Sequence, residues 1–261
     1  MKPALKEIYL DIENHLKEYG FKLYKGKVWK YDPVIGYVIG VEVELTRWGT
    51  LNELYVCGSS YRAPIKQNKH SAKKEPLPLT WLRTNTLYSR HGGESVFAMG
   101  SPYQPVDITL RQQYETLRPY LERQVFPLLM FDTDTKTYLQ NTEKLHIMAC
   151  EAFWGVEGVT DMSLALEYCY HNDIDSALRI IDLYMVLCDA QIQSIAEGYK
   201  HLPSDERQKI TDNWEQEKKK ACGLAETIQS EPETVRRMIE ENTAVSIKNC
   251  GSFFTSRFFS R

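Results

Sequence analysis

The chain has 261 residues, enough for one large domain or two of ordinary size, and its 43% hydrophobic and 26% charged residues are typical of a globular protein. It lacks an apolar run of the roughly 20 residues that cross a membrane, and its first residues lack the apolar core of a secretory signal. We therefore expect a cytoplasmic protein with no membrane partner. The six cysteines form no C-x-x-C pair, which argues against a zinc ribbon or a thioredoxin-like site.

Charge is distributed unevenly along the chain. The formal net charge is −3, yet residues 1–131 carry 18 Lys and Arg against 13 Asp and Glu, whereas residues 132–261 carry 14 against 22. The two halves therefore have opposite sign, +5 and −8. This asymmetry predicts two modules, 1–131 and 132–261, that attract each other or attract different partners.

The first module begins with a helix and two hairpins. Apolar residues at helical spacing predict an amphipathic helix over residues 4–19. Residues 21–31 predict a short hairpin, and residues 35–57 predict two long strands joined by a turn. The order of these elements predicts an antiparallel meander.

The long hairpin alternates apolar and polar residues. Ile39, Val41 and Val43 share one face, with Glu42 and Glu44 on the other, as expected for an antiparallel sheet with one covered face. We interpret the two glutamates as a solvated strand face, with a carboxylate site as the alternative.

Residues 62–80 are rich in proline and lysine, which predicts a mobile, solvated loop. The alternative is an arm that contacts phosphate or nucleic acid through its cations. The loop has no aromatic residue on which a base could stack, and this argues against nucleic acid as the partner. The basic residues are Arg62, Lys66, Lys69, Lys73 and Lys74.

Residues 81–104 contain His91, Glu94 and Ser95 close together, the residue types of a catalytic triad. Proximity in sequence does not establish triad geometry, and a Gly-Gly turn with polar neighbours is common. The chain also lacks a G-x-S-x-G nucleophile elbow. A polar turn is the favoured interpretation, with a small His/Glu enzyme as the alternative.

From Asp107 onward the apolar spacing is helical, and Pro119 is expected to break or kink the first helix or to begin a second one. A polar cluster at residues 132–135 marks the predicted module boundary. The remainder reads as helix throughout, and its strongest stripe, over residues 174–199, follows a capping residue at Asp173.

Glu143 and His146 have the Glu-x-x-His spacing of di-iron bundles, which places both side chains on one helix face. Such sites need two of these pairs and two further glutamates, whereas this chain has one pair, with Cys150 one turn beyond it. We interpret His146 as a packed residue and expect no cofactor. A single-metal site is the alternative.

Asp175, Asp182 and Asp189 recur every seven residues and so share one helical face, with Arg179 placed to pair locally. A solvated seam is the favoured interpretation, and an acidic surface for a basic partner, such as a toxin or a nucleic-acid-binding protein, is the alternative.

The C-terminal stretch 252–261 contains four phenylalanines, each stabilising by about 2 kcal/mol on full burial. The tail therefore either docks on the core of its own chain or forms a patch for a partner or a homodimer.

Residues 1–131 resemble the bacterial family filed as domain of unknown function 4304. The resemblance is carried by the first helix, the stretch 20–31, the Val/Glu-rich strand 37–45, the strand 51–60 and the closing helix with Tyr114 and Leu117. It implies an α+β fold and a binding or immunity-type role. The family supplies no catalytic residues to carry over, and the helical half falls outside the resemblance.

We therefore predict an α+β domain at 1–131, with helices on one face of an antiparallel sheet of four to five strands, followed by an all-α domain at 132–261. The predicted function is a non-enzymatic protein-binding module, with an immunity or defence role as its specific form. A small His/Glu or single-metal enzyme and a nucleic-acid-binding protein using residues 62–74 are the alternatives. The candidate binding residues are Arg47, Trp48, Arg62, Lys66, Asp175, Asp182 and Asp189.

Overall fold

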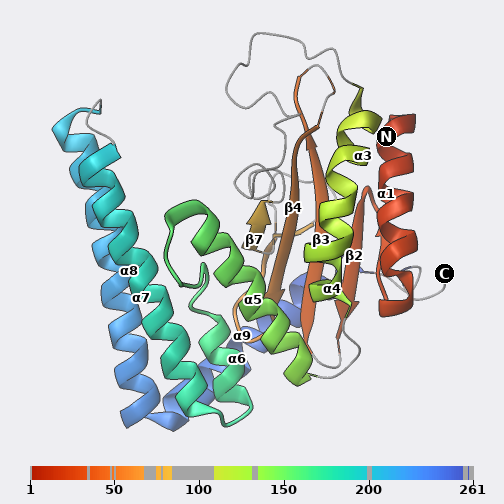
Figure 1. Cartoon of the computed structure of the whole chain (residues 1–261). Coiled ribbons are helices and arrows are strands. Elements are labelled where there is room, and N and C mark those ends of the chain that lie inside the picture. Colours follow the sequence, from red (N-terminus) through yellow and green to blue (C-terminus); the bar gives the residue numbers. More distant parts are fainter. Residues whose placement is uncertain are drawn as a thin grey trace.

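The computed structural model describes residues 2–33, 36–47, 49, 51–67, 75–77, 79–83, 109–130, 135–198, 202–254 and 258. The fold is α+β, as predicted, with an antiparallel sheet in the N-terminal part and helices in the C-terminal part (Figure 1). The strands are β1 (Lys22–Tyr24), β2 (Lys27–Asp32), β3 (Tyr37–Leu45), β4 (Leu51–Ser60), β5 (Lys66–Gln67), β6 (Pro76–Leu77) and β7 (Leu79–Arg83). The helices are α1 (Pro3–Leu16), α3 (Leu110–Tyr120), α4 (Phe126–Leu129), α5 (Thr135–Trp154), α6 (Leu164–Tyr170), α7 (Ile174–Gly198), α8 (Ser204–Ser230) and α9 (Pro232–Gly251).

The main sheet has the strand order β1-β2-β3-β4-β7, with every neighbouring pair antiparallel. Strands β1 to β4 follow the chain as a meander, which confirms the two predicted hairpins. Helix α1 confirms the predicted first helix. Pairing of Val41 with Val56 fixes the register of the two long strands. Since side chains alternate along a strand, this register also fixes which residues face each layer of helices.

One face of the sheet, here called the near face, carries the alternating apolar residues predicted from the sequence. Ile39, Val41 and Val43 are buried on it, together with Leu54 and Val56 of β4. Helices α1, α3 and α5 cover this face (Figure 1). The helices are amphipathic and contribute their apolar stripes to the core that buries the near face.

The opposite face, here called the far face, is covered too, and the expectation of helices on one face only is wrong. The chain returns at its end, where α9 runs behind the sheet (Figure 1). Phe253, Phe254 and Phe258 pack there against Trp29 and Tyr31 of β2. Docking of the tail on the core of its own chain is therefore confirmed for these three phenylalanines.

The far face has a polar end and an aromatic end. At the polar end Glu42 pairs with Lys27 at 2.8 Å, and Glu44 accepts hydrogen bonds from Asn52 and Tyr55. These strand residues engage neighbouring side chains across the sheet, and Lys27 also contacts Glu75 at 2.5 Å, so one ammonium joins two carboxylates. The described phenylalanines of the tail lie at the end of the face where β1 and β2 present Tyr24, Trp29 and Tyr31.

The C-terminal helices form a second layer that shares its core with the sheet. Helices α7 and α8 are antiparallel and extend away from the sheet (Figure 1). One hydrophobic cluster continues from the near face through α5 and α6 into α7, by way of Tyr138, Leu164 and Ile181. The predicted boundary at residue 132 lies outside the described residues, and a shared core joins the segments on either side of it.

Two helices that contain proline, α3 and α4, follow the sheet in the chain and precede this layer. Pro119 is inside α3, and a π-helical turn, Leu121–Val125, follows before α4. A proline lacks the N–H that an α-helix needs and crowds the preceding turn. The chain therefore accommodates Pro119 by a local change of helix type, which corresponds to the predicted irregularity.

Candidate functional site

The structure separates the basic candidates predicted from the sequence. Arg47 is exposed at the turn between β3 and β4, whereas Lys66 is exposed on β5, beyond the other end of β4. Strand β4 spans ten residues, so about 33 Å of chain lies between these ends. Trp48 lies outside the described residues. Arg47 and Lys66 therefore do not belong to one basic patch.

Arg62 is buried, and its interpretation as part of a solvated loop is wrong. Its exposed fraction is 5%, and its Nε lies 3.6 Å from Oε2 of Glu167, which is 1% exposed. Because both side chains are buried, removing one partner alone would leave the other as an uncompensated charge in the interior. Such a change lowers the free energy of unfolding by about 3–5 kcal/mol. Arg62 is therefore a link between the sheet and α6.

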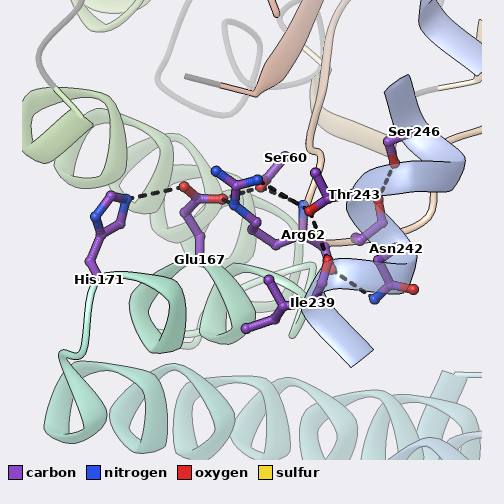
Figure 2. Close-up of polar contacts among 9 residues, drawn as sticks. Ser60, Arg62, Glu167, His171, Ile239, Asn242, Thr243 and Ser246 are labelled. Carbon is purple, nitrogen blue, oxygen red and sulfur yellow. Dashed lines mark hydrogen bonds and ion pairs between the residues drawn. The ribbon is translucent and has the colours of Figure 1, made fainter. Parts of the chain in front are cut away.

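Further polar groups complete this link, which we call the Arg62 network: Ser60, Arg62, Glu167, His171 and Thr243. Ser60 Oγ donates a short hydrogen bond to Glu167, and Arg62 Nη1 donates to Thr243 Oγ1 at 3.1 Å. The ring of His171 lies 3.3 Å from the other oxygen of Glu167. Figure 2 shows this chain of contacts running from the end of α6 to α9. The network joins β4, α6 and α9 at one buried point.

Helix α9 also fixes the backbone that follows Arg62. Asn242 donates to the carbonyl of Arg62, Ser246 donates to that of Ala63, and Asn249 donates to that of Ile65, at 2.7–2.8 Å. These three α9 residues lie at positions i, i+4 and i+7 and therefore on one face of the helix. They satisfy the backbone of an extended segment that has few strand partners, so residues 62–67 are held in place. Residues 68–74 lie outside the described residues.

Tyr170 and His171 follow each other at the end of α6 and face two different cavities. The guanidinium carbon of Arg62 lies 3.6 Å from the ring centroid of Tyr170, a close cation–π contact. Glu167 Oε1 lies 3.3 Å from Nε2 of His171, a polar contact on the buried side of that ring. The buried ion pair thus supports both side chains from behind, and each of them lines one cavity.

The first cavity, which we call the corner pocket, has a volume of about 440 Å³ and lies where α8 meets α9. Ile228, Val235 and Ile239 provide an apolar floor, while Tyr170 is 50% exposed at its edge beside the exposed Ile174. Glu233 and Glu240 add carboxylates to the rim, where Arg236 contacts both. The pocket can accept an apolar side chain beside a positively charged one.

The second cavity, which we call the α5–α7 groove, has a volume of about 800 Å³. Its cationic residues are Lys136 and Lys144 of α5, Arg179 of α7 and, when protonated, His171. Glu143 at its base accepts hydrogen bonds from both Nη atoms of Arg179, at 2.6 and 2.7 Å, and from Tyr168. Burial raises the pKa of Glu143, but these hydrogen bonds outweigh burial and the net shift is downward.

The Glu143/His146 metal alternative does not fit this geometry. His146 is buried with its Nδ1 against Thr160, and burial lowers its pKa to about 3, so the imidazole is neutral. Glu143 is engaged by Arg179, and the burial that surrounds Cys150 raises the pKa of its thiol to about 12. Throughout the described part of the chain, no three metal-ligating side chains gather at one point. His91 and Glu94 lie outside the described residues.

The acidic candidates lie on α7 as predicted. Asp175, Asp182 and Asp189 are all exposed, and Asp189 pairs with Lys218 of α8 at 2.6 Å. The expected pairing of Arg179 with these aspartates is wrong, because Arg179 crosses instead to Glu143 on α5. Within the described ranges, Asp175 and Asp182 have no cationic partner. These two carboxylates are therefore displayed to solvent.

Sequence reasoning missed Glu167, Tyr170, His171 and the polar face of α9. A signal was present for α9, because Asn242, Ser246 and Asn249 repeat at helical spacing. No comparable signal marked Glu167, since it lies in a short helix whose buried face is apolar on either side. Its role depends on contact with β4, more than a hundred residues earlier in the chain.

No family model matches the chain, and neither the curated proteins nor the solved structures include a significant match to it. The resemblance to the domain of unknown function 4304 family therefore stays a prediction. Among the described helices, none combines the length and the apolar character needed to span a membrane.

Proposed function

We propose that this chain is a non-enzymatic module that binds a basic protein at the corner pocket. The observation that carries the proposal is the exposure of Tyr170 and Ile174 at the edge of a pocket with an apolar floor. Exposed aromatic and aliphatic side chains beside a concave surface are typical of the centre of a protein interface.

The charge of the rim supports a basic partner, because Glu233 and Glu240 outnumber its one cation, Arg236. Glu233 and Glu240 lie on the rim, and Asp175 follows Ile174 on the adjoining helix, within a half of the chain whose net charge is −8. Such a surface attracts cationic segments and accelerates their association. The expected ligand is a segment with an apolar or aromatic residue flanked by lysine or arginine.

The interior chemistry supports a binding role over a catalytic one. Arg62 and Glu167 neutralise each other, and His146 contacts Thr160 in the core. These groups stabilise the fold and do not converge on either cavity as a nucleophile and a base. An immunity-type role, in which the acidic surface masks a basic toxin, is the form of this proposal that the resemblance implies.

Affinity capture with the full chain tests the proposal. The wild-type protein should retain one basic partner at stoichiometric amounts and release it as salt is raised, because salt screens exposed charges. The double variant Glu233→Lys/Glu240→Lys should retain about tenfold less, since the rim then repels the partner. It should fold normally, because exposed ion pairs contribute little stability.

A matched control reverses two carboxylates elsewhere. Asp212 and Glu215 are exposed on α8, and the helical rise places Glu215 about 20 Å from Ile228 of the pocket floor. Asp212→Lys/Glu215→Lys should therefore leave capture unchanged. Equal losses in the two double variants, or no stoichiometric partner for the wild type, would contradict docking at the corner pocket.

A further inference from the structure

The α5–α7 groove differs in charge from the half of the chain that forms it. Residues 132–261 have a net charge of −8, yet the groove gathers Lys136, Lys144 and Arg179 against the carboxylates of Glu143 and Asp173. With His171 neutral, the groove is net positive. A cationic concavity in an acidic region concentrates anions locally, because its walls focus the field.

Both carboxylates of the groove are already engaged. Glu143 accepts from Arg179 and Tyr168, while Asp173 accepts from the backbone N–H of Ser176 and so caps the start of α7. Each carboxylate is therefore directed at a partner within the wall. An anion in the groove would meet cations whose nearest negative charges are already hydrogen-bonded.

Arg179 is held in one orientation by this arrangement. A guanidinium has five N–H donors, and Glu143 accepts one from each Nη atom at 2.6 and 2.7 Å, so three donors remain. The side chain is half exposed, and its fork is fixed before any ligand arrives. A pre-ordered arginine loses less conformational entropy on binding than a free one.

Lys144 supplies a second cation from the opposite wall. Across the residues that the structure describes, no carboxylate forms a salt bridge with it. Lys136 lies two turns earlier on the same face of α5, so the two lysines extend along the groove. An arginine fork with two lysine point charges is a combination that suits phosphoryl oxygens.

We propose that the α5–α7 groove binds a small organic phosphate carrying at least two negative charges. Its volume of about 800 Å³ lies within the range of small-molecule sites and accommodates a ligand of nucleotide size. Arg179 and Lys144 contact the phosphoryl oxygens from the two walls, and His171 closes the end of the groove nearest the Arg62 network. This site is independent of the protein-binding role proposed for the corner pocket.

Calorimetric titration of the full chain with inorganic pyrophosphate at low salt tests this site. The expected result for the wild type is saturable binding of one pyrophosphate per chain. Lys136→Gln/Lys144→Gln should weaken binding about tenfold, because hydrogen bonds to charged groups are among the strongest polar contacts. Orthophosphate should bind more weakly than pyrophosphate, since it reaches fewer of the cations.

Two lysines of α8 provide the control. Lys209 and Lys219 are exposed and lie outside the groove, so Lys209→Gln/Lys219→Gln should retain the wild-type affinity. Equal weakening in both double variants would show diffuse attraction and would overturn the site, as would the absence of saturation in the wild type. Capture of the basic partner at the corner pocket should remain unaffected by Lys136→Gln/Lys144→Gln, so the two proposals can fail separately.

Discussion

The two faces of the sheet are closed by different chemistry and by different parts of the chain. The near face is largely aliphatic and is covered by α1, α3 and α5. The far face is closed by aromatic rings, where Phe254 stacks on Tyr31 at 4.3 Å and contacts Trp29 edge-on. One core of the sheet is therefore predicted by the alternation of apolar residues in its own strands. The other core forms only with residues that lie more than 200 positions later in the chain.

Hydrogen bonds strengthen the aromatic closure. Tyr24, Lys22 and Lys25 of the first hairpin donate to the carbonyls of Phe253 and Phe258. The ammonium of Lys25 also lies 4.2 Å from the ring centroid of Phe253. The tail is therefore held by directional contacts as well as by burial.

The largest expected effect comes from opening the far face. Phe253→Ala should lower the free energy of unfolding by about 3–5 kcal/mol, because a buried ring is lost and a cavity remains beside Trp29. Urea unfolding measures this change. Val245→Ala, at an exposed position of α9, should change stability by less than about 0.5 kcal/mol. Similar small effects in both variants would show that the tail does not close this face.

Opening the near face should have a comparable but separable effect. Leu54→Ala should cost about 2–5 kcal/mol, because Leu54 is fully buried beneath the helices. The fluorescence of Trp29 reports on the far face alone if the other four tryptophans are first replaced by phenylalanine. Both variants are then made in that protein. Phe253→Ala should shift the emission of Trp29 to longer wavelength, whereas Leu54→Ala should not. A shift in both variants would mean that the two cores are not independent.

A single added methyl group probes the tightness of the far face. At Gly40 a Cβ would lie 2.8 Å from Cζ3 of Trp29, so Gly40→Ala should destabilise by about 1–3 kcal/mol. Gly223 lies within α8, where a Cβ would meet no atom within 4 Å, and Gly223→Ala should stabilise by about 0.5–1 kcal/mol. Opposite signs in thermal unfolding are expected, and destabilisation by both variants would contradict a difference in packing between the two positions.

Helix α5, which covers the near face, contains the buried His146. This residue makes the free energy of unfolding depend on pH. Burial lowers the pKa of His146 from 6.5 to about 3. Between these values the unfolded chain takes up a proton that the native chain does not, so stability falls as the pH falls below 6.5. The loss at pH 5 should be about 2 kcal/mol relative to pH 7. His146→Gln should remove this part of the slope in urea titrations, and an unchanged slope would contradict the assignment.

The near face was predictable because its pattern is local. Alternation along β3 identified Ile39 and Val43 as buried, and helical spacing identified the helices that cover them. The tail left two outcomes open, because the cost of exposing phenylalanine does not say which surface covers it. To predict where the tail docks, one would have to know that Trp29 and Tyr31 lie on the far face of the sheet.

The candidate site was less predictable, because it depends on pairs between distant segments. The sequence identified Arg62 as a cation. Its burial could not be predicted, because the carboxylate that pairs with it, Glu167, belongs to the distant helix α6. Arg179 was expected to pair along its own helix, where an i,i+3 or i,i+4 partner gains only about 0.2–0.5 kcal/mol. The bidentate contact with Glu143 is stronger than such a pair, and only the packing of α5 against α7 brings it within reach.

The route of the tail has a consequence for biosynthesis. Lys25 and Phe253 meet although 228 positions separate them, so Trp29 and Tyr31 leave the ribosome long before their cover is made. At roughly 5–20 residues per second, translation leaves these rings uncovered for about 10–45 s. During that interval the nascent hairpin displays an aromatic surface that chaperones recognise, and this surface is concealed once Phe253, Phe254 and Phe258 have been synthesised and can dock on it.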